Sequence, residues 1–214
     1  YEDEQFRALI RKAQKQIEQR NLMQVVVSNR YQADFKGNPF SVYRELRKET
    51  PAPSMYYFEY PEFSVMGVSP ESIYQVQSRE MKVSPVTGAR PRGKTAREDV
   101  QMELMLLKNA NEVKAHNMLV DATTEDLRRI CEPKSVTMTE YMKPVLFKHS
   151  IRLTSEITGQ LLPNIHVVDA FSTLLPPASS TGVPKFESAK LIGELEGVRR
   201  SFYGGVIGYF SFNG

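Results

Sequence analysis

The chain has 214 residues, of which 41% are apolar, and this is enough to build the core of one large domain. Its 28 basic and 25 acidic residues are spread along the chain and leave a net charge of +3, so no basic block indicates a nucleic-acid partner. No apolar run reaches the length of a membrane span, and the single cysteine, Cys131, cannot form an internal disulfide. We therefore expect one cytoplasmic domain with a buried structural thiol.

The first part of the chain predicts a mixture of helices and strands. Residues 2–19 place apolar side chains at helical spacing, which predicts a helix. Residues 22–35 contain a run of β-branched residues, which predicts a long strand. Asn38 and Pro39 are typical of the start of a helix, which we expect to continue to Lys48. Further strands are expected at residues 55–60, 63–68, 74–77 and 81–84.

A loop rich in glycine and arginine is expected at residues 85–93. Gly88 and Gly93 permit backbone angles that other residues resist, and Arg90 and Arg92 offer planar donors to a carboxylate. The loop is therefore a candidate binding loop. A solvated basic turn between a strand and a helix is the alternative.

The second part of the chain continues the mixed pattern. Thr95 and Glu98 form a capping box that predicts a helix to Leu107, and a second helical pattern covers residues 110–131. The remaining expected elements are long strands at residues 135–147 and 149–160, short helices at residues 169–174 and 186–196, and a final strand at residues 204–212.

Residues 175–185, which we call the hydroxyl loop, join two of these helices. Ser179, Ser180 and Thr181 can donate hydrogen bonds, and flanking prolines stiffen the chain around Gly182. The amides at the start of the next helix carry partial positive charge, so a carboxylate would be stabilised there. The alternative is a helix entry rich in serine and threonine that binds no ligand.

Six motifs follow one another along nearly the whole chain, in the order seen in chorismate-binding enzymes. They are Gln24-Val-Val-Val-Ser, Gly67-Val-Ser-Pro-Glu71, Pro85-Val-Thr-Gly-Ala-Arg-Pro-Arg-Gly93, His116-Asn-Met-Leu-Val-Asp121, Thr181-Gly-Val-Pro-Lys185 and Tyr203-Gly-Gly-Val-Ile-Gly-Tyr-Phe210. The chain resembles the catalytic domain of anthranilate synthase component I and of aminodeoxychorismate synthase component I.

The resemblance implies an α+β fold in which two facing, mostly antiparallel sheets form a sandwich with helices packed outside. It implies an active site between the sheets that takes chorismate and Mg²⁺, and ammonia supplied by a separate glutamine amidotransferase subunit. Residues 1–214 would be a chorismate-binding catalytic domain, incomplete at its C-terminus and without an N-terminal regulatory region. Homo-oligomers and hetero-oligomers are both open, and we expect no nucleic acid or membrane as partner.

Gln24 is the position that best separates reactions within the family. Members that add water to chorismate carry a lysine base here, whereas members that use ammonia carry glutamine. A neutral amide suits ammonia, which already has its lone pair and needs no strong base. Many aminodeoxychorismate synthases place a lysine nucleophile where this chain has Thr87, and anthranilate synthases usually have alanine, so Thr87 argues against covalent lysine catalysis.

The resemblance also assigns a pocket. Ser179 keeps a hydroxyl where threonine is usual and is a catalytic candidate, and Lys185 is expected to anchor the hydroxyl loop electrostatically. The residues expected to line the chorismate pocket are Glu71, Gly88, Ala89, Ser179, Gly182 and Tyr203.

Two of the departures from the family pattern concern the metal ligand and the proton donor. Ala115 stands where a glutamate binds Mg²⁺, so Glu112, one helical turn earlier, is the candidate metal ligand, and the alternative is an ordinary pair with His116. Arg152 stands where a histidine assists loss of the ring hydroxyl; it can stabilise negative charge but donates protons poorly.

Three functions therefore remain open. The first is amination of chorismate followed by pyruvate elimination, which gives anthranilate. The second is the folate-branch reaction that gives aminodeoxychorismate. The third is a degenerate chorismate-binding regulatory module that lacks catalysis.

Overall fold

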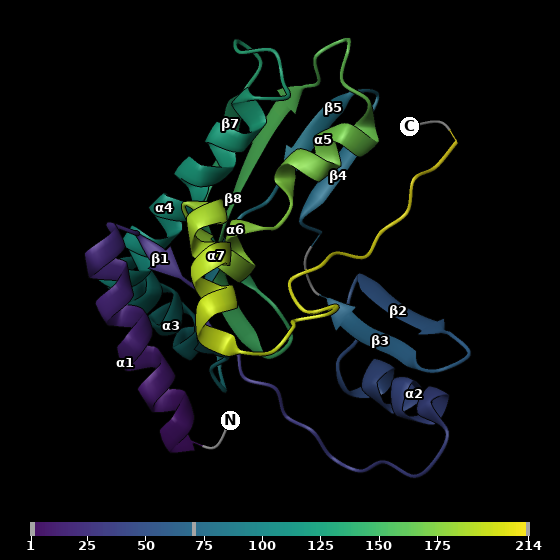
Figure 1. The fold of residues 1–214 in the computed structure, drawn as a ribbon. Coiled ribbons are helices and arrows are strands. Elements are labelled where there is room, and N and C mark those ends of the chain that lie inside the picture. The colour runs from purple at the N-terminus through teal and green to yellow at the C-terminus, as the bar shows by residue number, and fades with distance from the viewer. Residues whose placement is uncertain (1–2, 70–71, 213–214) are drawn as a thin grey trace.

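The computed structural model describes residues 3–69 and 72–212. Its strands form one five-stranded sheet and two two-stranded sheets, and every pairing between them is antiparallel (Figure 1). Helices pack against the large sheet, and one helix accompanies a two-stranded sheet at the side of the main body. The predicted α+β class with antiparallel sheets is therefore confirmed.

Strand β8 (Ser150–Gln160) is the centre of the large sheet. Strand β7 (Thr137–Leu146) pairs along one side of it, while β5 (Glu80–Val83) and β6 (Val86–Pro91) share the other side, and β4 (Tyr74–Gln77) pairs with β5. Alternate residues of β8 from Ile151 to Gly159 are buried, and those between them are half-exposed. One face of the sheet therefore packs into the core.

Some of the helices pack on that buried face, and the others lie beside it. The helices are α1 (Asp3–Arg20), α2 (Pro39–Glu49), α3 (Ala96–Lys108), α4 (Ala110–Arg128), α5 (Val167–Leu174), α6 (Ala178–Thr181) and α7 (Lys185–Glu196). The largest buried cluster joins β5 and β8 to α4 and α5 through residues such as Met81, Leu127 and Ile157. A second cluster packs α1 against α7, and a third packs α3 against β8.

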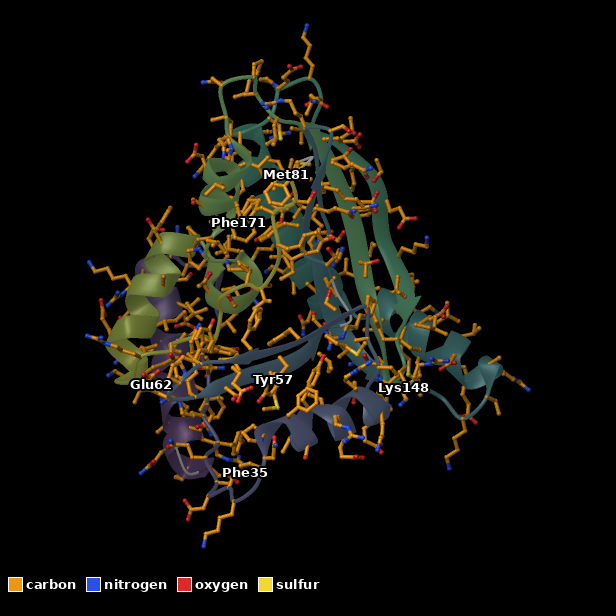
Figure 2. All side chains as sticks on the ribbon, turned by 90° about the vertical axis from the view of Figure 1, so that its right-hand side faces the viewer. Phe35, Tyr57, Glu62, Met81, Lys148 and Phe171 are labelled. Carbon is orange, nitrogen blue, oxygen red and sulfur yellow. The ribbon has the colours of Figure 1, made fainter. Side chains whose placement is uncertain are left out.

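The smaller unit consists of α2 and the hairpin of β2 (Ser54–Glu59) and β3 (Ser64–Ser69). The Tyr57 ring lies between the hairpin and α2, 5.1 Å from the Phe40 ring and 5.6 Å from the Tyr43 ring (Figure 2). Asn38 caps α2 by accepting a hydrogen bond from the Phe40 amide. The predicted helix start and the predicted hairpin are both confirmed.

Local signals also fixed other element ends. The Thr95 hydroxyl accepts a hydrogen bond from the Glu98 amide and begins α3, although the Glu98 carboxylate accepts from the Lys94 amide instead of the cap itself.

Cys131 is fully buried, as predicted, and burial raises the pKa of its thiol to about 11. Within the described residues, none of the helices is both long enough and apolar enough to cross a membrane.

Three predicted elements were wrong in extent or type. The long strand at residues 22–35 is reduced to β1 (Gln24–Val25), because it pairs only with β9 (Gly182–Val183), a two-residue partner. No strand is assigned at residues 204–212. The predicted loop at residues 85–93 is mostly strand β6, which pairs with β8. Strand propensity becomes a strand only where a partner backbone runs alongside.

Candidate functional site

The hydroxyl loop folds into the single turn α6 and the short strand β9. The hydroxyls of Ser180 and Thr181 both donate to the Pro177 carbonyl, at 3.0 and 2.9 Å. The Ser180 and Thr181 hydroxyls, which the sequence pattern indicated as possible donors to a ligand, are therefore used within the loop. Ser179 is exposed and lines a hollow, so its side chain is the one that the loop presents.

Gly182 brings the loop into contact with Gln24. It has a φ of 130°, and a Cβ built on it would lie 2.1 Å from the Gln24 carbonyl oxygen. The Ser188 hydroxyl donates to the same oxygen at 2.9 Å. Only glycine fits at this position, because the atom that a side chain would strike is backbone. The structure thus holds Gln24 directly beside the hydroxyl loop.

Lys185 anchors the loop, as predicted. Its ammonium lies 2.6 Å from the Asp126 carboxylate on α4 and donates to the Thr173 carbonyl on α5 at 3.1 Å. The two side chains of the pair are only 7% and 12% exposed. A buried ion pair with its hydrogen bonds satisfied fixes the loop against both helices.

Tyr203 belongs to the same region of the molecule. Its side chain is exposed, and the next residue, Gly204, is so close to the hydroxyl loop that a Cβ there would lie 3.3 Å from the Ser180 hydroxyl oxygen. The segments that carry Gln24, Ser179, Gly182 and Tyr203 therefore lie together, and we call these four residues the hydroxyl-loop group.

A small hollow joins this group to the start of β6. Ser179 lines it together with Pro85 and Val86, and its volume is about 50 Å³. Such a space holds a water molecule and is far below the roughly 300 Å³ of a small-molecule pocket. Gly88 is not among its lining residues. The two predicted binding loops thus meet at this hollow, but a cyclic acid does not fit inside it in this conformation.

Gly88 lies instead beside Glu112. It has a φ of 64° where the register of β6 shifts, and a Cβ there would lie 3.2 Å from a Glu112 carboxylate oxygen. The Arg90 guanidinium lies 3.6 Å from the same carboxylate. Ala89, between them in sequence, is exposed. The alternative pair of Glu112 with His116 was wrong, because both His116 nitrogens bond elsewhere.

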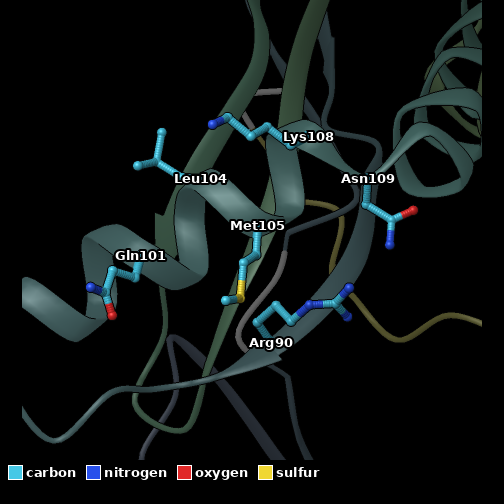
Figure 3. Close-up of a pocket in the computed structure, with 6 residues that line it drawn as sticks. All are labelled: Arg90, Gln101, Leu104, Met105, Lys108 and Asn109. Carbon is cyan, nitrogen blue, oxygen red and sulfur yellow. The ribbon is translucent and has the colours of Figure 1, made fainter.

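An open hollow of about 710 Å³ borders Arg90 and the exposed side of α3, and we call it the Arg90 hollow. Figure 3 shows Met105 reaching from α3 toward Arg90 on β6. Its other lining residues are Gln101, Leu104, Lys108 and Asn109. This volume falls within the range of small-molecule sites, although the hollow is widely open to solvent.

Arg152 lies apart from Glu112. It sits between the buried residues Ile151 and Leu153 on β8, so its side chain points to the half-exposed face of the sheet. Arg90 pairs with Ile151, and Arg90 contacts Glu112 on the helix-covered face. Arg152 and Glu112 are thus on opposite faces. Glu71, another predicted pocket residue, lies outside the described residues.

Arg92 was wrongly predicted as a donor to a ligand. Its guanidinium makes a bidentate pair with Asp99, at 2.7 to 3.1 Å, and also donates to the Phe147 carbonyl. The hydrogen bonds from Arg92 and from the Gly93 amide lower the pKa of Asp99. This cluster fixes the start of α3 and is structural.

A buried network that the sequence did not predict joins Thr87, His116 and Ser155. His116 is fully buried, its Nδ1 lies 2.7 Å from the Thr87 hydroxyl, and its Nε2 lies 2.7 Å from the Ser155 hydroxyl. The Ser155 oxygen also accepts a hydrogen bond from the Met142 amide. The periodic burial of β8 could have signalled this network, since Ser155 is the polar residue among its buried positions.

The network favours one tautomer of His116. If the Ser155 hydroxyl donates to Nε2, then Nδ1–H donates to Thr87 and every polar atom in the chain of bonds is satisfied. Burial lowers the pKa of His116 and so favours the neutral ring. In this tautomer the ring cannot take a proton from Thr87, so the arrangement positions the Thr87 side chain and does not activate it.

The chain matches the family of chorismate binding enzymes over residues 1–214. It belongs to this family. The match covers every element that carries the hydroxyl-loop group and the Arg90–Glu112 pair. The resemblance drawn from the six motifs is confirmed.

Named relatives agree with this assignment. The chain is 35% identical over 211 residues to anthranilate synthase component 1 of Aquifex aeolicus, which covers 99% of this chain and 43% of the relative. It is 36% identical over 214 residues to the corresponding protein of Bacillus subtilis, covering 100% of this chain and 42% of the relative. The chain thus spans less than half the length of these relatives.

The fold agrees as well. The crystal structure of anthranilate synthase component I from Streptococcus pneumoniae superposes with a TM-score of 0.89 at 34% identity. The superposition covers 99% of this chain and 46% of that chain. The arrangement of sheets and helices described above is therefore that of this relative.

The described residues alone do not make a magnesium site. Across residues 3–69 and 72–212, no three His, Cys, Asp or Glu side chains gather where they could hold a metal ion. Glu112 offers one carboxylate, its neighbour Ala115 has no ligand atom, and Arg90 brings a positive charge close to it.

Proposed function

We propose that this chain is the chorismate-binding part of a subunit of the anthranilate synthase component I type. The observation that carries the proposal is the match along the whole chain to relatives of that name, at 34–36% identity. The position of Gln24 beside the hydroxyl loop supports an aminating reaction over one that adds water, because a neutral amide cannot deprotonate water.

The proposed reaction balances with ammonia as the second substrate. A bond forms from the ammonia nitrogen to a ring carbon of chorismate, and the ring hydroxyl leaves as water. The ether C–O bond then breaks, a ring proton is lost, and the enolpyruvyl group gains a proton and leaves as pyruvate. Anthranilate remains, and ammonia would come from a glutamine amidotransferase partner.

Each residue of the hydroxyl-loop group has a role in this proposal. The Gln24 amide would orient ammonia, the Ser179 hydroxyl would donate a hydrogen bond to the substrate, and Tyr203 would cover it. Gly182 would keep Gln24 and the loop in contact. Because the hollow beside Ser179 is small, substrate binding would require the surrounding segments to open or shift.

Arg152, Glu71 and Glu112 stay predictions. Arg152 could stabilise negative charge on the leaving oxygen only if substrate reaches the half-exposed face of the sheet. We propose Mg²⁺ as cofactor, with Glu112 as the carboxylate from this chain and further oxygen ligands from outside the described residues. Bound Mg²⁺ would neutralise a substrate carboxylate.

The experiment is a product assay on the complete subunit with chorismate, ammonium and Mg²⁺, read by mass spectrometry. Anthranilate with an equal amount of pyruvate supports the proposal, and aminodeoxychorismate without pyruvate supports the folate-branch alternative. Gln24→Leu should abolish amination while Gln75→Leu, an exposed strand glutamine, should not. An equal effect of the two substitutions would overturn the role of Gln24.

A regulatory module is a second candidate, favoured by the absence of a three-ligand metal group in the described residues and by Ala115. Calorimetry with chorismate distinguishes it from the enzyme. Binding of chorismate without formation of any product would support the module, and turnover would exclude it.

A further inference from the structure

Arg200 makes more contacts with the hydroxyl-loop region than its place after a helix suggests. It follows α7 by one turn, beyond Gly197, whose φ of 65° ends the helix in the left-handed region. Its guanidinium donates from Nε to one Glu196 oxygen at 2.8 Å and from a terminal nitrogen to the other at 2.5 Å. This is the bidentate geometry that arginine forms with carboxylates.

Two further N–H groups of Arg200 reach two other segments. One terminal nitrogen donates to the Ser180 carbonyl in the hydroxyl loop at 2.7 Å, and the other donates to the Val26 carbonyl just after β1 at 2.6 Å. The guanidinium carbon also lies 5.3 Å from the centre of the Tyr203 ring, within the range of a cation–π contact.

Glu196 completes the cluster from the other side. Its carboxylate accepts hydrogen bonds from the Ser28 amide at 2.7 Å and from the Ser28 hydroxyl at 3.0 Å. The Glu196 side chain is 2% exposed and that of Arg200 is 15% exposed. Burial opposes ionisation of Glu196, but the hydrogen bonds from Arg200 and Ser28 lower its pKa. The pair is therefore ionised and satisfied.

These contacts converge on segments that carry the proposed substrate-binding residues. The Val26 carbonyl follows Gln24 by two residues, the Ser180 carbonyl follows Ser179 by one, and the Tyr203 ring is touched directly. The two carbonyls belong to segments more than 150 residues apart in sequence. The pairing of β1 with β9 and a hydrogen bond from the Val26 amide to the Thr181 carbonyl already join these segments, and the Arg200 guanidinium adds a side-chain bridge between them.

We propose that Arg200, held by Glu196, is the positioning residue of the chorismate pocket. It fixes the strand after Gln24, the hydroxyl loop and the Tyr203 ring relative to one another, and it does not itself react. This inference rests on the proposed function and extends it to a residue outside the predicted pocket set. Arginine is required because four directed donors in one plane are used at once.

The test compares Arg200→Gln and Arg200→Lys with Arg20→Gln in the complete subunit. Arg20 is the matched control, since it makes a bidentate pair with Glu194 on the exposed side of the same helix. We expect kcat/KM for chorismate to fall on the order of 10²-fold in both Arg200 variants, mainly through KM, because misplaced binding groups weaken substrate binding. Arg20→Gln should stay within about twofold.

The division between KM and kcat distinguishes positioning from folding. A variant that is merely part-unfolded has fewer active molecules, so its kcat falls while its KM is unchanged. That result, or an unchanged kcat/KM in Arg200→Gln, would overturn the proposal. Retention of full activity in Arg200→Lys would also overturn it, since a lysine supplies the charge without the planar donors.

Hydrogen exchange gives a readout that does not depend on the reaction. Arg200→Gln should speed exchange at the amides of residues 26–28 and 180–182 and leave the strands of the large sheet unchanged. If the wild-type subunit makes no product from chorismate, the proposed function fails, and this exchange pattern still decides whether Arg200 ties the segments together. Uniform exchange changes across the chain would contradict it.

Discussion

The hydroxyl-loop group and the Arg90–Glu112 pair differ in how firmly they are held. The first is fixed by the buried Lys185–Asp126 pair and by the Arg200 cluster, with distances near 2.6 Å. The second is one half-exposed pair at 3.6 Å beside an open hollow. The comparison suggests that the fold preorganises the first region and leaves the second adjustable, as a site does when further ligands complete it.

The largest expected effect is at Gly182. Gly182→Ala should destabilise folding by more than about 4 kcal/mol, because its Cβ would meet the Gln24 carbonyl carbon and oxygen and its φ disfavours L-residues. Gly193→Ala is the control: it lies inside α7 with no atom within 4 Å of the added methyl, so it should stabilise by up to about 1 kcal/mol. Urea unfolding measures both. If both substitutions changed the free energy of unfolding equally, the Gln24 backbone would be able to move away from the added Cβ at little cost.

The buried ion pair comes next. Lys185→Met leaves the Asp126 carboxylate buried without its cation and should lower the free energy of unfolding by about 3–5 kcal/mol. The control is Arg20→Met, which breaks an exposed pair and should leave that free energy nearly unchanged. Combining Lys185→Met with Asp126→Asn should recover part of the loss. Absence of recovery would mean that packing, and not charge, explains the effect.

His116, which bonds to Thr87 and Ser155, predicts a pH dependence of stability. Its pKa is lowered in the folded state, so the unfolded chain binds the proton first as pH falls. Stability should be present above about pH 6.5 and should fall below it, by up to about 1.4 kcal/mol per pH unit. Denaturant midpoints between pH 7 and pH 5 measure this slope. His116→Gln should reduce it, and an unchanged slope would assign it to other groups.

The smallest effect on stability is expected at Glu112. Glu112→Gln weakens a half-exposed pair and should change the free energy of unfolding by less than about 1 kcal/mol. If Glu112 supplies a Mg²⁺ ligand, the same variant should need more Mg²⁺ for half-maximal activity. A metal titration checks this, with Glu125→Gln as an exposed control on the same helix. If Glu112→Gln lost much stability and needed no more Mg²⁺, the Arg90–Glu112 pair would be a structural contact and not an adjustable ligand site.

Sequence patterns predicted the features that depend on residues close together in the chain. Asn38 and Thr95 marked helix starts because a cap bonds to amides two or three residues away. The motif order predicted the family and the α+β class. The anchoring role of Lys185 also followed from its place in a motif.

The features that the sequence did not predict depend on contacts that appear only in the folded chain. Residues 22–35 have strand-forming side chains, yet the ladder ends where β9 ends. The Arg92 guanidinium has donors that suit a carboxylate ligand, but these donors bind the Asp99 carboxylate instead. The Arg200 cluster joins residues whose common feature appears only once the chain is folded. The separation of Arg152 from Glu112 likewise depends on strand register, which side-chain type does not specify.

The shared use of β8 by three strands bears on how the chain assembles during synthesis. Among the described strands, β5 pairs with both β4 and β8, so β5 can pair with β4 before β8 has been synthesised. Strand β6 pairs only with β8, so it has no partner strand until residues 150–154 have left the ribosome. The hairpin of β7 and β8 closes from adjacent sequence. Once made, β8 offers its other edge to β5 and β6, which precede it in the chain.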